Sequence, residues 1–341
     1  MKKTFRTVTA LALAAAVGLL TGCAANAAGT TEQAASDLHT VRVGLMTGLP
    51  DQYAVYIGTE EGIFEKYGIY AETNEYAAGI NTIDAIANGT EDTGILADFA
   101  AVNRIGNTLD ATNLVLFSEL SLNETNNGGL YVPPEYAGDL KSLDGTEGWL
   151  TQIGTVWEYY NWQAQTYIGL DPAKQNVVQI DSMQTGIALA QQGGGTAVVA
   201  SGANAKRFEE SGWVLAASSQ DIGIKTGIYL TTTREYLAAH QEDLANYLRA
   251  LGESVTYIND HLEDSAARVE AKFGVDAEDF KQTWTSYTFE LGFTEAGAAH
   301  LDEVNAWAYG EGKYDTEYNI RDFIDTSAAE IAFPDNVTYN K

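Results

Sequence analysis

The sequence predicts an α/β fold with mostly parallel sheets, and two observations support this prediction. The chain has 341 residues, of which 45% are hydrophobic and 19% charged, with five prolines. That composition is enough to bury a large core and excludes a disordered polymer. From residue 41 onward, short apolar runs typical of strands alternate with amphipathic stretches typical of helices.

The first series of elements runs up to residue 125. Apolar runs bounded by turn residues predict strands over 41–46, 69–75, 94–96 and 114–117. A helix is expected over 52–61, after a turn at 48–51. A second helix begins near residue 80 and ends at Asn88-Gly89, where the glycine suits a left-handed cap. The segment 126–129, rich in asparagine and glycine, predicts a crossing to a second lobe that opens with a strand over 129–132.

The second series repeats this order. Strands are expected over 152–154, 177–180 and 197–200, and helices over 155–168 and 185–191, the latter ended by the glycines at 193–195. A returning strand is expected over 222–230. Apolar residues at helical spacing then predict a long helix over 237–258 and a final helix that begins near residue 294.

The first 22 residues have the pattern of a secretion signal. A basic start with Lys2, Lys3 and Arg6 precedes an uncharged apolar run over 8–20, which is too short for a permanent membrane span. The run ends in Leu20-Thr21-Gly22-Cys23, which resembles a bacterial lipobox, so Cys23 is expected to be lipidated and to become the new N-terminus. Residues 23–40 have the composition of a flexible tether.

Charge and cysteine content exclude several kinds of partner and cofactor. Asp and Glu number 47 against 19 Lys and Arg, giving a formal charge of −28, so nucleic acid and anionic lipid headgroups would be repelled. A single cysteine excludes disulfides within the chain and cysteine-rich metal centres. The four histidines show no HExxH or HxxxH spacing, so neither a metal nor a cofactor is expected.

Two stretches resemble a known family. Residues 60–69 (Glu-Glu-Gly-Ile-Phe-Glu-Lys-Tyr-Gly-Ile), with Ala78-Gly79 and residues 84–89, resemble solute-binding proteins of ABC importers, in the nitrate/sulfonate/taurine and thiamine-pyrimidine-precursor subgroup. Residues 169–170, 188–195, 236–237 and 240–244 resemble the second-lobe repeat and a following helix of that family. The chain departs from the family pattern at Thr196-Ala197.

The resemblance implies a two-lobed, periplasmic-binding-protein-like fold of type 2 with the ligand in a cleft between the lobes. It places lobe 1 at 41–125 and 223–341, with the C-terminal helices, and lobe 2 at 126–222. It also implies a monomer that is lipid-anchored outside the cytoplasm, captures a small solute without a cofactor and delivers it to an ABC permease. Closure of the lobes on the solute is expected.

Loops that follow the strands are the candidate ligand site, because helix N-termini at the carboxyl edge of a sheet present free backbone N–H groups. The candidate residues are Leu49, Asp51, Tyr53, Gly79, Ala97, Asp98, Phe99, Thr155, Trp157, Ser201 and Asn204. Tyr53 suits stacking on a ligand, whereas Tyr56, one turn on, suits packing. Asp98 could contact the ligand or cap the next helix. Trp157 is expected to reach the cleft, and Tyr160 to be buried.

These loops contain no lysine or arginine, while Asp51 and Asp98 are acidic. The side chains therefore favour a neutral or amine-bearing solute, such as a flat aminopyrimidine between Tyr53 and Trp157 with Asp98 as acceptor. An anion held by backbone N–H groups is the alternative, and Arg104 could turn inward to assist it.

Two other classes of function compete with solute binding. Thiamine-pyrimidine synthases, which are enzymes, share the fold that the resemblance implies, but they carry a cysteine-rich segment and an active-site histidine. This chain shows no catalytic triad, paired-carboxylate motif or phosphate loop. An adhesion or structural lipoprotein is disfavoured because the sequence has no internal surface repeats.

Overall fold

The computed structural model describes residues 38–76, 79–109, 111–123 and 128–340. The predicted signal (1–22), Cys23 and most of the predicted tether lie outside the described residues. Strand β1 begins at His39, inside the stretch 23–40 that was expected to be tether. Among the described helices, none is long and apolar enough to cross a membrane.

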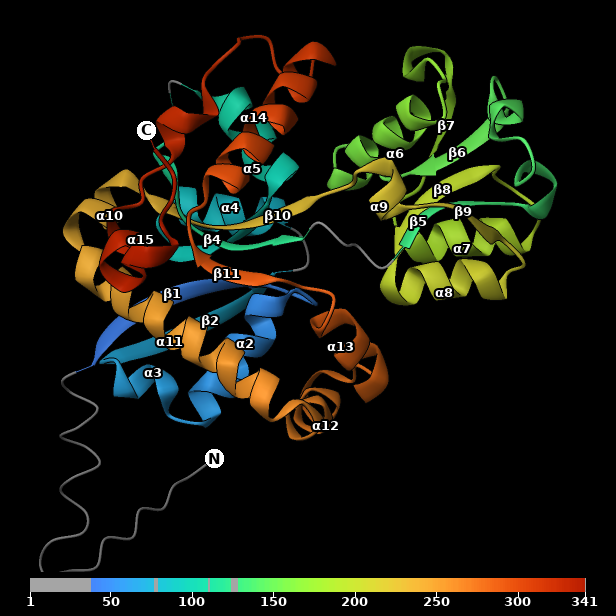
Figure 1. Ribbon diagram of the computed structural model, residues 1–341. Coiled ribbons are helices and arrows are strands. Elements are labelled where there is room, and N and C mark those ends of the chain that lie inside the picture. Colours follow the sequence, from blue (N-terminus) through green and yellow to red (C-terminus); the bar gives the residue numbers. More distant parts are fainter. Residues whose placement is uncertain (1–37, 77–78, 110, 124–127, 341) are drawn as a thin grey trace, which may run out of the picture. The chain divides into compact units, whose positions relative to one another are not determined.

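The first sheet has six strands in the order β11-β4-β10-β3-β1-β2 (Figure 1). These strands are β1 (His39–Met46), β2 (Ile69–Tyr76), β3 (Thr93–Ala97), β4 (Leu114–Asn123), β10 (Thr226–Thr233) and β11 (Phe289–Gly292). Strand β1 is parallel to β2 and β3, whereas β10 is antiparallel to both β3 and β4. The returning strand β10 is therefore inserted between two strands of the first series.

The second sheet repeats this arrangement with five strands in the order β7-β6-β8-β5-β9. They are β5 (Gly128–Val132), β6 (Glu147–Thr151), β7 (Asn176–Gln179), β8 (Ala197–Ser201) and β9 (Val214–Ser218). Strand β6 is parallel to β7 and β8, and β5 lies antiparallel between β8 and β9. In each sheet, the strand that follows a crossing is thus antiparallel to both of its neighbours.

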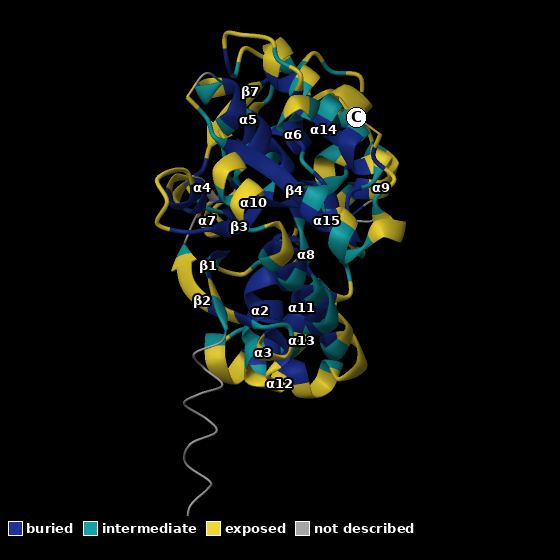
Figure 2. Cartoon of the chain, turned by 90° about the vertical axis from the view of Figure 1, so that its left-hand side faces the viewer, coloured by how far each residue is buried: buried dark blue, intermediate teal, exposed yellow. Residues whose placement is uncertain are grey.

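Helices cover both faces of the first sheet, because alternate side chains of its strands point to opposite faces. One core lies under α2 (Pro50–Glu60), α3 (Ile63–Lys66) and α11 (Gln241–Asp260), and it takes Ile95 from β3. The other core lies under α4 (Gly79–Ala87), α5 (Asp98–Thr108) and α14 (Glu295–Gly310), and it takes Leu96. All ten residues of β4 are buried as a result, and Figure 2 shows this central strand in the colour of buried residues.

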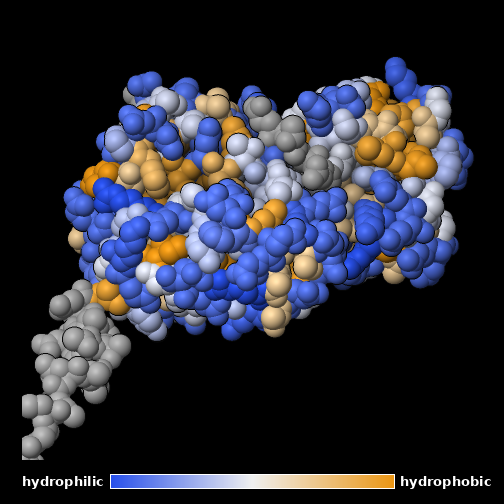
Figure 3. Space-filling model, turned by 60° about the horizontal axis from the view of Figure 1, so that its bottom comes forward, coloured by the Kyte–Doolittle hydropathy of each residue, from blue (hydrophilic) through white to orange (hydrophobic). Residues whose placement is uncertain are grey.

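The second sheet is covered in the same way. Helices α7 (Met183–Gln191) and α8 (Gly202–Glu210) share one core with Leu150 and Val198, while α6 (Val156–Tyr167) packs with Trp149 and Val199. The remaining helical elements are α9 (Ser219–Ile222), α10 (Arg234–Ala239), α12 (Leu262–Phe273), α13 (Ala277–Trp284), α15 (Ser327–Ala332), η2 (Pro134–Tyr136), η3 (Leu140–Leu143), η4 (Pro172–Lys174), η5 (Ile320–Phe323) and η6 (Pro334–Asn336). Hydrophilic side chains predominate on the face shown in Figure 3.

Three predicted elements differ from the structure. A strand was expected over 152–154, but this segment forms a turn at Gly154 (φ +81°). The strand of this region is β6, which ends just before it at Thr151. The strand expected over 222–230 begins only at Thr226, because a capping box at Ser218 starts the short helix α9 first. The long helix expected over 237–258 is interrupted at His240, whose backbone (φ −134°, ψ 35°) is not helical.

A buried acid lies at the start of α2. Asp51 is 1% exposed, and neither of its carboxyl oxygens makes a hydrogen bond of good geometry, although backbone N–H groups lie near them. Burial raises the pKa of Asp51 to about 8, and the neighbouring backbone N–H groups oppose this shift only in part. The carboxyl group is therefore mostly protonated at neutral pH.

We expect Asp51→Asn to stabilise the protein increasingly as the pH rises. In the unfolded chain the carboxyl group ionises near pH 4, but in the folded chain it ionises only near pH 8. The wild type therefore has its full stability below about pH 4 and loses stability as the pH rises towards 8. The variant lacks this loss, which amounts to up to about 5 kcal/mol. Denaturant unfolding at several pH values measures the difference, and a pH-independent difference would contradict the prediction.

Helix α2 packs closely on α11 at a glycine. A Cβ atom added to Gly58 would lie 1.9 Å from the hydroxyl oxygen of Ser254 and 2.8 Å from the ring of Phe64. Overpacking of this kind costs about 1–3 kcal/mol. This exceeds the gain of about 1 kcal/mol that alanine brings to a helix interior.

Gly58→Ala should therefore lower the free energy of unfolding, although helix propensity alone predicts a gain. The matched control is Gly138→Ala, where an added Cβ would meet no atom within 4 Å, so its effect should be small. Chemical denaturation of both variants provides the comparison. A Gly58→Ala variant that is more stable than the wild type would contradict the prediction, because it would show that α2 and α11 can move apart here without lowering the free energy of unfolding.

Candidate functional site

A cavity of about 230 Å³ lies at the carboxyl edges of both sheets. From the first lobe it is lined by the ends of β1, β3 and β4 and the start of β10, and from the second lobe by the starts of α6 and α8. Residues in and after α13 close it. The lining residues are Met46, Leu49, Ala97, Asn123, Val156, Trp157, Tyr160, Ser201, Gly202, Thr226, Ile228, Gln282, Thr283, Ser286 and Tyr287.

Four helices begin at this cavity. Leu49, Ala97 and Ser201 are the N-cap residues of α2, α5 and α8, and Val156 is the first residue of α6. None of the three N-cap residues caps its helix with its side chain. Each helix start carries a partial positive charge. Some of the first N–H groups already have partners, however: Gln52 donates to the carbonyl oxygen of Leu49 and Phe99 to Oδ1 of Asp98, while Pro50 has no N–H.

The strands explain why these four starts meet. Helices α2, α5 and α8 follow directly after β1, β3 and β8, and α6 follows β6 after a short turn. Parallel strands end at one edge of a sheet, so the helices that follow them begin there. The inserted strand β10 adds its own start to the same edge, because Ile228 pairs with Ala97 and Thr226 pairs with Asn123.

The described lining contains no charged side chain. Its walls are aromatic and aliphatic, with hydroxyl and amide groups at several points. Trp157 packs edge-on against Tyr160, and the hydroxyl group of Tyr160 is hydrogen-bonded to that of Thr226. Burial raises the pKa of Tyr160 well above its usual value, so this hydroxyl keeps its proton. The cavity can therefore hold a polar group at the helix starts and an apolar group against Trp157.

Four of the residues predicted from the sequence line this cavity, namely Leu49, Ala97, Trp157 and Ser201. Thr155 does not line it, but it caps α6, since its hydroxyl oxygen accepts a hydrogen bond from the N–H of Trp157 at 3.3 Å. Gly79 is the first residue of α4, and Asn204 is not a lining residue. Tyr160 is buried as predicted, and it lines the cavity as well.

The expectation that Tyr53 stacks on a ligand is not met in this structure. Its ring is 6% exposed and packs edge-on against Phe273 and Phe280, with ring centroids 5.7 Å and 5.2 Å apart. Helices α12 and α13, which carry these two rings, lie more than 200 residues further along the chain, so their packing on α2 could not be anticipated. Asp51 is likewise buried rather than part of the lining.

Asp98 is not among the lining residues either. It is completely buried, and its Oδ2 atom accepts a hydrogen bond from the N–H of Gly227 at 2.9 Å and lies 2.7 Å from Nε2 of His300. Phe99, the next residue, is buried and packs edge-on against Trp307. Arg104 is paired with Asp84 and does not line the cavity.

Sequence reasoning missed the lining residues of the inserted strand and of the segment around α13. Thr226 and Ile228 lie in a strand that was expected to begin four residues earlier. Thr283 and Tyr287 lie on and just after a helix that no motif indicated. Asn123, at the end of β4, was detectable in principle, because it stands shortly before the predicted crossing at 126–129.

No protein-family model matches the sequence, and no curated protein matches it. Solved structures do match its fold. The periplasmic aliphatic sulphonate binding protein SsuA from Escherichia coli superposes with a TM-score of 0.72 at 16% identity, over 84% of this chain and 92% of that protein. The periplasmic nitrate-binding protein NrtA from Synechocystis PCC 6803 gives 0.64 at 14% identity, over 89% and 92%.

The desulfurization enzyme DszB is also similar, with a TM-score of 0.62 at 11% identity, over 87% of this chain and 99% of that enzyme. Binding proteins and an enzyme therefore share this architecture, and identities this low establish the fold alone. The two-lobed α/β fold predicted from the sequence is confirmed, and the chain has the periplasmic-binding-protein fold.

Proposed function

We propose that this protein is the extracytoplasmic solute-binding component of an ABC importer, and that its solute is a small anion such as a sulfonate or nitrate. The observation that supports this most is the meeting of four helix starts, from both sheets, on one cavity whose described lining residues carry no charge. Backbone N–H groups and helix dipoles bind anions without any basic side chain.

The position of the acids removes the main objection to an anion. Asp98 is not a lining residue and its carboxyl oxygens contact Phe99, Gly227 and His300, while Asp51 is buried with a pKa of about 8. The aminopyrimidine hypothesis needed Tyr53 and Asp98 at the ligand, and neither is a lining residue. The volume of about 230 Å³ is below the range of about 300–1,000 Å³ for drug-sized ligands, which favours a small solute.

The proposed transport cycle requires only binding and release. A solute that contacts helix starts of both lobes stabilises the arrangement in which those starts lie close together. A permease that separates the lobes would then weaken the site and release the solute. Under this proposal the chain acts as a lipid-anchored monomer and needs no cofactor for the binding step.

The proposal predicts opposite effects of Ala97→Asp on folding and on binding. Aspartate and asparagine are both good N-cap residues, so each variant should be at least as stable as the wild type. A carboxylate about 4 Å from a bound anion opposes it by roughly 4 kcal/mol at an effective dielectric constant of 20. Ala97→Asp should therefore weaken binding of ethanesulfonate or nitrate on the order of a hundredfold or more, measured by calorimetry.

Ala97→Asn is the matched control, because it has nearly the same shape without the charge and should weaken binding much less. Ethylamine serves as the cationic probe in the same titrations. If the wild type binds ethylamine but neither anion, or if Ala97→Asp tightens anion binding, the proposed solute class is wrong.

An enzyme of the same fold is the alternative function, since DszB shares the architecture. The two functions differ in what happens to the bound compound. An importer component releases its solute unchanged after equilibrium dialysis, whereas an enzyme yields a product in proportion to time and protein. Mass spectrometry of the recovered compound distinguishes them.

Membrane attachment through Cys23 gives a separate prediction. A diacylglyceryl group on this thiol would hold an acidic chain at a membrane, and a single serine substitution would remove the acceptor atom. We expect the wild type to incorporate radiolabelled fatty acid in a bacterial host and Cys23→Ser to incorporate none. Label in the serine variant, or its absence in the wild type, would refute the anchor.

A further inference from the structure

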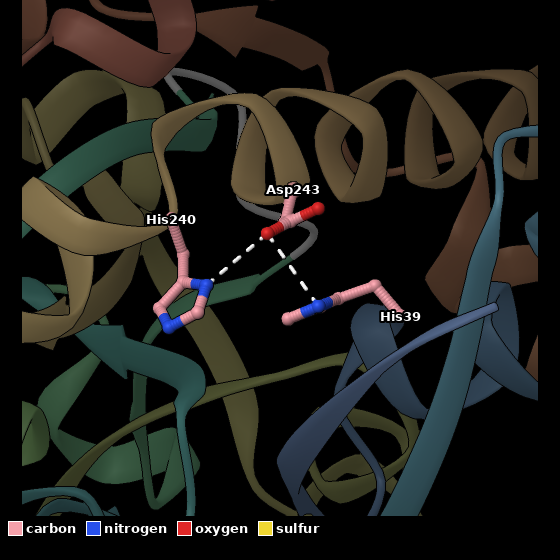
Figure 4. Close-up of side chains that lie close together, drawn as sticks. All are labelled: His39, His240 and Asp243. Carbon is pink, nitrogen blue, oxygen red and sulfur yellow. Dashed lines mark hydrogen bonds and ion pairs between the residues drawn. The ribbon is translucent and has the colours of Figure 1, made fainter. Parts of the chain in front are cut away.

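Two histidines far apart in the sequence meet one aspartate beside the first sheet. His39 is the first residue of β1, while His240 precedes α11 and Asp243 lies in the first turn of that helix. Oδ2 of Asp243 is 3.1 Å from Nδ1 of His240 and 3.5 Å from Nδ1 of His39. Figure 4 shows both rings turned towards this one oxygen.

We propose that His39, His240 and Asp243 bind a divalent transition-metal ion, with Zn²⁺ as the best fit. One ligand atom from each residue lies within 4.8 Å of the others. Ligand atoms of a tetrahedral zinc site are about 3.3 Å apart when the bonds are about 2.0–2.1 Å long. The two nitrogen–oxygen distances are already close to this value.

The donor set suits zinc better than a hard cation. Imidazole nitrogens bind Zn²⁺, Cu²⁺ and Ni²⁺, whereas Mg²⁺ and Ca²⁺ prefer oxygen ligands alone. All three side chains are about one third exposed, so an ion could enter and a water molecule could take the fourth position. Asp243 would neutralise part of the ion's charge, and it also offsets the positive end of α11.

A neighbouring tyrosine orients one of the two rings. Nε2 of His39 is 3.4 Å from the hydroxyl oxygen of Tyr236. This contact engages Nε2 and leaves Nδ1, the ring atom that lies 3.5 Å from Oδ2 of Asp243, as the one that would bind an ion.

The ring of His240 is held by the same tyrosine. It stacks on Tyr236 with ring centroids 4.4 Å apart. Tyr236 thus contacts the second nitrogen of the His39 ring and stacks on the His240 ring. Metal-binding histidines are oriented by outer contacts of this kind. The ion would join the start of β1 to the start of α11, two segments about 200 residues apart.

The chain contains a built-in comparison. His261 and Asp264 repeat the spacing of His240 and Asp243, and His261 stacks on Tyr257 as His240 stacks on Tyr236. However, Nδ1 of His261 lies 3.0 Å from the carbonyl oxygen of Tyr257, and Asp264 pairs with Arg268. The spacing alone therefore does not build the site, because His39 supplies the third ligand.

Calorimetric titration of Zn²⁺ into the full chain, after metal removal with a chelator, tests the proposal. An excess of Mg²⁺ occupies the many surface carboxylates during the titration. We expect one saturable Zn²⁺ site per chain in the wild type. Loss of a residue that only supports a ligand weakens metal binding about 10–100-fold. Loss of a ligand should cost at least as much, so we expect His39→Ala, His240→Ala and Asp243→Asn each to weaken Zn²⁺ binding by at least about tenfold.

His261→Ala is the control and should bind Zn²⁺ with the affinity of the wild type. Melting of the metal-free variants shows whether each one folds, and Zn²⁺ should raise the melting temperature of the wild type and of the control only. Co²⁺ titration of the wild type provides a readout without any substitution, since tetrahedral Co²⁺ absorbs strongly in visible light. Absence of a saturable site, wild-type affinity in His39→Ala, or a weak octahedral Co²⁺ spectrum would overturn the proposal.

Discussion

The insertion of one antiparallel strand into each sheet is the constraint on which the rest of this structure depends. Strand β5 pairs with β8 and β9, and β10 pairs with β3 and β4, so each strand that follows a crossing has backbone partners on both sides. Neither strand can leave its sheet without breaking two ladders of hydrogen bonds. The crossings therefore tie the carboxyl edges of both sheets to one cavity, where four helices begin.

Buried contacts hold the helix starts in place around that cavity. Asp98 connects α5 to the backbone of β10 at Gly227 and to α14 at His300, and all of these groups are remote from solvent. Removing one partner would leave a buried polar group without a hydrogen bond, which costs about 1–3 kcal/mol. The lining is thus preorganised by residues that do not line the cavity, among them Asp98, an acid in a candidate loop.

The two lobes also share an aromatic contact outside the cavity. Trp307 of α14 packs against Tyr159 of α6 with ring centroids 4.7 Å apart, and Lys313 pairs with Glu158 at 2.7 Å. A movement of one lobe relative to the other would either preserve this contact or break it. A rotation about the crossings that keeps Trp307 seated on α6 preserves it, since the rings can tilt without losing contact area.

The sequence by itself determined the alternation of strands and helices, the two-lobed fold and the loops where helices begin, because apolar periodicity and glycine positions are local signals. It therefore indicated Leu49, Ala97, Trp157 and Ser201 correctly as residues at the cavity. Only the tertiary structure decided which aromatic rings and acids are buried, as for Tyr53 and Asp98, and only it brought His39 to His240. These outcomes depend on α11, α13 and α14 packing on strands up to 200 residues away, and no local pattern encodes a contact over that separation.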